Sequence, residues 1–239
     1  MCFNPRPSVA NYTPRYYHQK AMNNLLLPIK RIPLLLYGHG SLVNGHYDTA
    51  PSKQFRHSKG TFHGDGWFYE GVWNQMFCKR VIEKLRELRI PYIWINETDY
   101  DMPLSERVER IQWYQAQFNG QVFLNEYHCN ASPSHRGRGF EVFTTRGEDL
   151  SDTLAQMKYT NVYDLLGKDK TIKMRPDRTD QDDDKEADFY VIKKAKCPGK
   201  LSEFLFFDNY DDAILLMDDR VVEKFVEAEV RTIIEFMTF

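Results

Sequence analysis

Near its start the chain runs Leu34-Leu35-Leu36-Tyr37-Gly38-His39-Gly40, an apolar segment that ends at a histidine between two glycines. An apolar run without alternation is typical of a strand that is covered on both faces of its sheet. Glycine in such a place indicates that another group approaches the backbone closely. Residues 32–37 are therefore predicted to form a central strand, with His39 exposed to a partner at its end.

Strands and helices alternate along the rest of the chain. Residues 70–88 are predicted to be helical because their apolar side chains recur at helical spacing. Further helices are expected to begin at Pro103 and to run from Leu215 to the end. The other expected strands are 92–95, 121–128, 139–145, 187–194 and 200–207. This order predicts a three-layer α/β domain with a largely parallel or mixed central sheet flanked by helices.

Composition excludes several classes of protein. The 239 residues are 42% hydrophobic and 14% aromatic, which excludes a disordered chain. A formal net charge of −2 gives no reason to expect nucleic acid or an anionic membrane as a partner. We interpret residues 1–30 as an N-terminal extension and residues 31–239 as a single catalytic domain.

Cysteine usage and the N-terminal segment indicate where the protein is made. The four cysteines are scattered and form no Cys-x-x-Cys pair, which favours free thiols in a reducing compartment. The run Leu25-Leu26-Leu27-Pro28-Ile29 is too short for a signal-peptide core or a membrane span. We expect the protein to be made in the cytoplasm without a signal peptide. It would then have to be released from the cell before it could act on a target outside the cytoplasm.

Three residues of metal-ligand type stand at the ends of predicted elements. His39 follows the first strand, Glu70 opens a helix, and His128 lies near the end of the strand 121–128. Two histidines and a carboxylate on rigid elements are a common ligand set of catalytic zinc. Glu203, on another predicted strand, could move protons, because an unpaired carboxylate in an apolar strand is costly as structure alone. The set suggests a metal-assisted hydrolase.

Plainer interpretations exist for these and neighbouring residues. A histidine at a strand end is usually just a polar residue with satisfied hydrogen bonds, and Glu70 could merely favour the helix dipole. Glu126 shares the sheet face of His128, and we interpret it as support rather than as a ligand. The acidic stretch 175–186 lacks the glycine and spacing of a calcium loop, so we expect an exposed loop. Single histidines in predicted loops are usually solvated; here they are His46, His57, His63 and His135.

Several short motifs occur in a characteristic order between about residues 32 and 235. They are Gly38-His39-Gly40, Tyr69-Glu70-Gly71-x-x-Asn74, Glu97-Thr98-Asp99, Leu104-x-x-Arg107, Tyr127-His128-Cys129-Asn130-Ala131, Gly139-Phe140-Glu141-Val142-Phe143 and Pro198-x-x-Leu201-x-Glu203-x-x-Phe206-x-x-Asn209. Each motif alone is weak, but their order and spacing together are specific. The chain resembles the zinc-dependent N-acetylmuramoyl-L-alanine amidases, a family of cell-wall autolysins and phage endolysins.

This resemblance implies a site and a reaction. His39, Glu70 and His128 would be the ligands of Zn²⁺, and Glu203 would be the catalytic carboxylate. The bond that the family cuts joins the lactyl group of N-acetylmuramic acid to L-alanine in peptidoglycan. One departure is the segment 41–48, which replaces a Gly-x-Asp-Pro-Gly type of loop. This change bears on substrate preference more than on chemistry.

Two further residues and a biological setting follow from the same resemblance. Arg107 and Glu141 match family positions, and we interpret both as hydrogen-bonding support. Because we recognise neither a signal peptide nor a wall-binding repeat in the sequence, we expect a phage or prophage endolysin. Such a protein would reach the wall with a holin-type partner. A bacterial autolysin is the second interpretation.

Two other functional classes compete with the amidase. A zinc carboxypeptidase would commonly take two ligands from a short His-x-x-Glu motif, and the sequence has none. A wall-binding protein without activity would not need to retain the three ligand-type residues together with Glu203.

Overall fold

A six-stranded mixed sheet forms the centre of the computed structural model, which describes residues 28–64, 66–147, 149–177, 179 and 182–239. Its strand order is β6-β1-β7-β10-β8-β9. These strands are β1 (Ile32–Tyr37), β6 (Ile93–Trp94), β7 (Val122–Asn130), β8 (Glu141–Thr144), β9 (Lys185–Glu186) and β10 (Gly199–Phe206). The helices are α1 (Glu70–Glu87), α2 (Leu104–Gln117), α3 (Leu150–Val162), α4 (Tyr190–Ala195), α5 (Tyr210–Leu216) and α6 (Asp219–Thr238). A π-helical turn, η3 (Tyr163–Gly167), directly follows α3.

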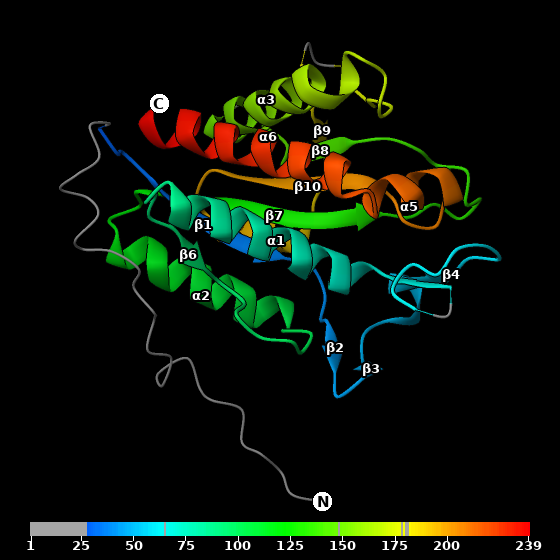
Figure 1. Cartoon of the computed structure of the whole chain (residues 1–239). Coiled ribbons are helices and arrows are strands. Elements are labelled where there is room, and N and C mark those ends of the chain that lie inside the picture. Colours follow the sequence, from blue (N-terminus) through cyan, green and yellow to red (C-terminus); the bar gives the residue numbers. More distant parts are fainter. Residues whose placement is uncertain (1–27, 65, 148, 178, 180–181) are drawn as a thin grey trace, which may run out of the picture.

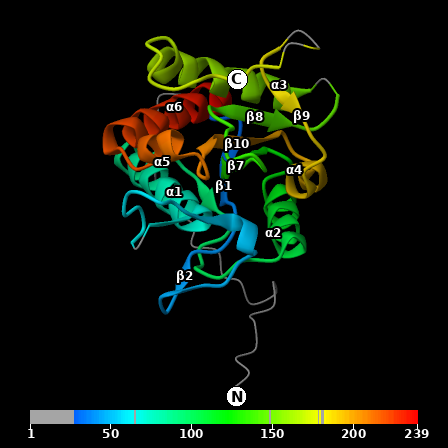
Figure 2. The same cartoon turned by 90° about the vertical axis from the view of Figure 1, so that its right-hand side faces the viewer.

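The central strands run parallel and therefore end at the same edge of the sheet. β1 pairs in parallel with β6 and β7, and β10 pairs in parallel with β7. β8 is antiparallel to β10 and β9 is parallel to β8, so these two strands run opposite to the other four. Helices cover both faces of this sheet (Figures 1 and 2). The predicted three-layer α/β fold with a mixed sheet is confirmed.

Alternating side chains divide the core into two parts. Phe123 and Tyr127 of β7 pack with α1, α3 and α6 on one face of the sheet. Val122 and Leu124 of the same strand pack with α2 and α4 on the other face. His128 has the parity of Leu124, so its side chain belongs to the α2 face of the sheet, and it points away from the core around Phe123 and Tyr127.

Two local predictions were wrong or incomplete. The predicted strand 187–194 is instead the helix α4, whose buried residues Val191, Ile192 and Ala195 follow helical spacing. A short apolar run does not distinguish strand from helix by its period alone. The helix α3 was not predicted, although Asp149 begins it with a capping box.

The ends of two predicted helices also differ. Leu88 lies one residue beyond α1 and is 44% exposed, so it does not belong to the buried stripe. The predicted last helix from Leu215 is divided into α5 and α6, because Asp218 accepts a hydrogen bond from the Arg220 amide and caps a new helix.

The long segments expected to be loops contain short ordered pieces. Residues 41–69 hold β2 (Leu42–Val43), β3 (His46–Tyr47), a 3₁₀ turn η2 (Pro51–Lys53), β4 (Gln54–Arg56) and β5 (Trp67–Tyr69). His57 is buried there and contacts the Phe207 carbonyl, so it is not a solvated histidine. Asp184 in the acidic segment is also fully buried, and its Oδ2 accepts a hydrogen bond from Thr144.

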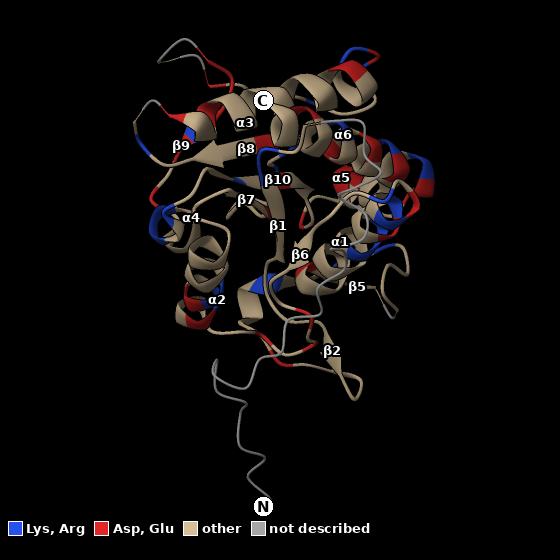
Figure 3. Ribbon diagram, turned by 90° about the vertical axis from the view of Figure 1, so that its left-hand side faces the viewer, with Lys and Arg blue, Asp and Glu red and all other residues tan. Residues whose placement is uncertain are grey.

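The described surface is mixed in charge. Basic and acidic segments are interspersed along the ribbon in Figure 3. Among the described residues, no helix is long and apolar enough to cross a membrane. Of the predicted N-terminal extension, residues 1–27 lie outside the described part, and the Lys30 amide donates to the Met237 carbonyl of α6 at 2.8 Å.

An ionic cluster is buried on the α6 face of the sheet. Glu229 of α6 lies 2.8 Å from Lys158 Nζ and 3.0 Å from Lys200 Nζ, and all three side chains are 0% exposed. The Tyr127 hydroxyl donates to the same carboxylate at 3.0 Å. Burial would raise the pKa of Glu229, but the two ammonium groups lower it to about 2. The cluster therefore ties α6 and α3 to the central strands.

We predict that Glu229→Ala lowers the free energy of unfolding by about 3–5 kcal/mol, because two buried ammonium groups lose their counter-charge. Glu227→Ala is the matched control: Glu227 is 50% exposed on the same helix, so its loss should cost at most about 1 kcal/mol. Denaturant titration of both variants measures the difference.

The same cluster predicts a pH dependence. The folded pKa of Glu229 is below its unfolded value of 4.5, so its contribution is present above pH 4.5 and disappears as pH falls toward 2. The stability gap between the wild type and Glu229→Ala should narrow over that interval. A gap that stays constant down to pH 2 would contradict this account.

Candidate active site

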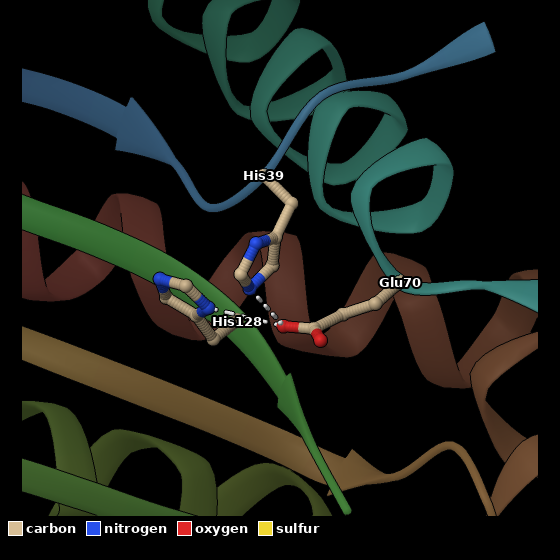
Figure 4. A group of neighbouring side chains, drawn as sticks. All are labelled: His39, Glu70 and His128. Atoms are coloured by element: carbon tan, nitrogen blue, oxygen red, sulfur yellow. Dashed lines mark hydrogen bonds and ion pairs between the residues drawn. The ribbon is translucent and has the colours of Figure 1, made fainter. Parts of the chain in front are cut away.

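Three side chains from separate elements converge at the edge where the parallel strands end (Figure 4). His39 follows β1, Glu70 opens α1, and His128 lies on β7. Oε1 of Glu70 is 3.3 Å from His39 Nε2 and 3.0 Å from His128 Nδ1. One ligand atom from each residue lies within 4.8 Å of the others. The three predicted ligand-type residues are thus brought together.

Two glycines allow this convergence. A Cβ on Gly38 would lie 2.0 Å from Cε1 of His128, so the imidazole packs where any side chain would stand. A Cβ on Gly71 would lie 1.8 Å from the carbonyl oxygen of Gly40. The backbone of His39 adopts φ 65°, a left-handed conformation that is uncommon outside glycine. Such a conformation is typical of functional sites, where surrounding structure holds it in place.

A second layer of carboxylates lies behind the two imidazoles. Glu126 Oε1 is 3.4 Å from Nε2 of His128, and Asp101 Oδ2 is 3.9 Å from Nδ1 of His39. Arg107, 1% exposed, donates to Asp101 at 2.9 Å and lies 4.0 Å from Glu126. The supporting role that the sequence suggested for Arg107 and Glu126 therefore has a geometric basis: one guanidinium lies between both carboxylates.

Glu70 is held in its ionised form. Its side chain is 1% exposed, and Lys53 Nζ lies 3.4 Å from Oε2. Burial would raise the pKa of Glu70, but its interactions with His39 and His128 lower it below its ordinary range. Asn74, one turn along α1, donates to the Gly38 carbonyl at 3.1 Å and so joins the helix to the strand end.

The two histidines differ in protonation. Burial lowers the pKa of His39, which favours the neutral imidazole that a metal ligand requires. Burial would also lower the pKa of His128, but hydrogen bonds with Glu126 and Glu70 raise it to about 10. A metal ion at this site would have to displace the proton of His128.

Glu203 lies on the strand next to His128. The two residues are register partners in the parallel pair of β10 and β7, and Glu203 also faces Glu141 across the antiparallel pair with β8. Glu203 is half-buried, and its Oε2 atom is buried without a hydrogen bond among the described residues. Burial raises the pKa of Glu203 to about 8, while the charge of His128 acts in the opposite direction.

Glu141 is engaged by several partners. Its side chain is 5% exposed and pairs with Arg175 and, at 3.3 Å, with Lys185 Nζ. The Asn130 amide donates to its other oxygen at 3.3 Å. These contacts give Glu141 the hydrogen-bonded setting expected from the sequence and place Arg175 and Lys185 beside β8.

Residues 36–235 match the protein family described as N-acetylmuramoyl-L-alanine amidase. This match covers most of the chain. The chain belongs to the N-acetylmuramoyl-L-alanine amidase family. Membership supports an amidase activity on peptidoglycan. No curated protein matched the chain.

Solved structures of two amidases and of an endolysin domain share the fold. N-acetylmuramoyl-L-alanine amidase AmiC2 of Nostoc punctiforme is 20% identical with a TM-score of 0.64, and the match covers 87% of this chain and 98% of that one. The catalytic domain of CwlV from Bacillus (Paenibacillus) polymyxa var. colistinus is 17% identical, with a TM-score of 0.63 and coverages of 86% and 97%. The catalytic domain of the CD27L endolysin targeting Clostridia difficile is 16% identical, with a TM-score of 0.57 and coverages of 86% and 97%.

The three converging residues of this amidase fit a zinc ion. Four-coordinate zinc with bonds of about 2.0–2.1 Å separates neighbouring ligand atoms by about 3.3 Å. The two distances from Glu70 Oε1, 3.3 and 3.0 Å, agree with that value. His39 Nε2 is buried and has no hydrogen-bond partner among the described residues, which is the state of a donor atom directed at a ligand. Glu126 and Asp101 would orient the imidazoles from behind.

Sequence reasoning missed some residues of the candidate site. Asp101 and Lys53 lie in segments without periodicity, and no sequence signal placed them beside His39 and Glu70. Asn74 was part of a quoted motif, and its distance of one helical turn from Glu70 is the signal that could have identified it.

We predict that Gly38→Ala disables the amidase centre, because the added methyl group requires the His128 ring to move. Displacing the His128 ring by about 1 Å should lower the rate of Gly38→Ala on the order of 10²-fold. The zinc content of this variant after dialysis should fall as well. Gly199→Ala is the control: it lies in neighbouring β10, and its Cβ would meet Leu124 Cβ at 3.1 Å. Wild-type zinc content and activity in Gly38→Ala would contradict the assigned packing.

Proposed function

We propose that this amidase hydrolyses the bond between N-acetylmuramic acid and L-alanine with a zinc ion held by His39, Glu70 and His128. The observation that carries the proposal is the distance from the Glu70 carboxylate to both imidazoles, which matches the distance between two ligand atoms of one zinc ion. Glu203 is the register partner of His128 on the next strand and so lies beside this site. Bound at this site, zinc would supply a Lewis acid that polarises the scissile carbonyl and acidifies water.

Glu203 moves the proton in this proposal. Its carboxylate accepts a proton from the water that attacks the amide carbonyl. The same proton is then delivered to the amide nitrogen as the carbon–nitrogen bond breaks, because an amide nitrogen leaves poorly unless it is protonated. The products are a lactyl carboxylate on the muramic acid and a free amino group on L-alanine. The unsatisfied Oε2 of Glu203 is consistent with a group that awaits such a partner.

The charged residues around the three ligand-type side chains have supporting roles in this proposal. Arg107 keeps Asp101 and Glu126 behind the two imidazoles, which sets the ring orientation and the nitrogen that each ring presents. Glu141, on the far side of Glu203, is neutralised by Arg175 and Lys185. This neutralisation limits the repulsion between Glu141 and Glu203 when both are ionised.

The family match favours this reaction over that of a carboxypeptidase, since the matched family is described as an amidase. A wall-binding protein without activity is the remaining alternative. The retained carboxylate at Glu203 and the complete ligand-type set oppose that alternative, and the next experiment decides it.

We predict that Glu203→Gln keeps the fold and the bound zinc but loses about 10²–10⁴-fold in rate, because glutamine preserves shape without basicity. The assay is the release of new amino groups from isolated peptidoglycan, with zinc content and thermal unfolding measured on the same samples. Glu109→Gln at an exposed position of α2 is the control and should retain activity. Wild-type turnover in Glu203→Gln would contradict the role of Glu203, and an inactive zinc-loaded wild type would contradict the amidase.

We also propose that the protein acts as an endolysin that is made in the cytoplasm and reaches the wall through a holin-type partner. A structural neighbour that is itself an endolysin domain supports this setting. Expression in bacteria with and without a membrane-permeabilising partner tests it. Lysis should require both the partner and intact Glu203, whereas lysis without the partner would favour independent export.

A further inference from the structure

The 3₁₀ turn η2 brings a cation to the edge of the proposed metal centre. Lys53 Nζ lies 3.4 Å from Oε2 of Glu70, whereas Oε1 of the same carboxylate faces the two histidines. The Glu70 side chain is 1% exposed, but the Lys53 side chain is 33% exposed. The Lys53 side chain therefore reaches from the surface to the buried Glu70 carboxylate.

Neighbouring residues anchor the segment that carries Lys53. The Tyr47 hydroxyl donates to the Lys53 carbonyl at 2.9 Å and accepts a hydrogen bond from the Gly71 amide at 2.9 Å, in the first turn of α1. Thr49 donates to Asp101, the carboxylate behind His39. The fold thus determines the position of Lys53, although its side chain remains long and flexible.

Lys53 is paired with Glu70 by charge alone. Oε2 of Glu70 accepts no hydrogen bond from any described residue, and this includes the ammonium group of Lys53. The three N–H groups of an ammonium can therefore donate to an incoming acceptor. A divalent cation held by Glu70 would repel this ammonium, which further favours a substrate anion as its partner.

The chemistry of the substrate identifies the anion, and this step rests on the proposed function. The carboxyl group of muramic acid is consumed in the scissile amide, and the sugar hydroxyl and acetamido groups are uncharged. The ionised carboxylates of the linkage therefore lie on the peptide side. The Glu126 carboxylate would repel such a peptide, whereas the partly exposed ammonium of Lys53, beside Glu70, would attract it.

We propose that Lys53 binds a carboxylate of the stem peptide on the leaving-amine side of the scissile bond. Lys53 then makes the amidase selective for stem peptides that carry a free acid over those that carry the amide. The segment 41–48, which replaces the usual loop of the family, leads into the turn that supplies this residue.

Two synthetic substrates test the proposal: N-acetylmuramoyl-L-alanyl-D-isoglutamine and the corresponding compound with a free α-carboxylate. Both have the γ-carboxyl group blocked as a methylamide, so that they differ only by a carboxylate in place of a carboxamide. For the wild type, kcat/KM should be about 5- to 30-fold higher with the acid than with the amide, which is the size expected for a partly exposed charge-assisted contact. Most of this difference should come from a lower KM for the acid. Lys53→Met should remove this preference by slowing cleavage of the acid alone. Lys53→Arg should retain most of it.

Controls separate this role from others. Lys59→Met removes a charge from an exposed position of the same loop and should leave the preference unchanged. Zinc content should be equal in the wild type and in Lys53→Met; loss of zinc would show that Lys53 supports the metal centre and would overturn the proposal. Equal wild-type rates on both substrates, or a preference that survives in Lys53→Met, would also overturn it. Failure of the wild type to cleave either substrate would instead contradict the proposed function.

Discussion

The parallel pairing of β1 with β7 is the constraint on which the site depends. Their register places Tyr37 beside Tyr127, and the Gly38 amide donates to the Tyr127 carbonyl at 2.8 Å. His128 then lies against Gly38, where the missing side chain leaves space for its ring. The centroids of the His39 and His128 rings are consequently 5.0 Å apart, and Glu70 at the start of α1 meets both.

Two cations balance the carboxylates of the site in different ways. Arg107 is buried, and its planar guanidinium donates in fixed directions to Asp101 and the Met102 carbonyl. Such a group is suited to a permanent structural contact. Lys53 is partly exposed and contacts Glu70 through charge alone, as a compact ammonium that can exchange partners. The first cation orders the carboxylates around the candidate metal centre, and we propose that the second is available to the substrate.

The sequence predicted which three ligand-type side chains come together better than it predicted some of the elements around them. His39, Glu70 and His128 could be grouped because each stands at the end of a strongly patterned strand or the start of a helix, and parallel strands end at one edge. The strand predicted at 187–194 failed because its apolar run is too short for the period to decide. Asp101 and Lys53 could not be found, because long loops place residues by tertiary contacts that leave no periodic signal.

The central claim is that one zinc ion is held by these three side chains. A crystal structure of the zinc-loaded protein, with anomalous scattering measured on both sides of the zinc absorption edge, tests it most directly. The account predicts a single strong peak within bonding distance of His39 Nε2, the Glu70 carboxylate and His128 Nδ1, with Glu126 still beside the other nitrogen of His128. A zinc peak bound elsewhere, with these three side chains unligated, would contradict it.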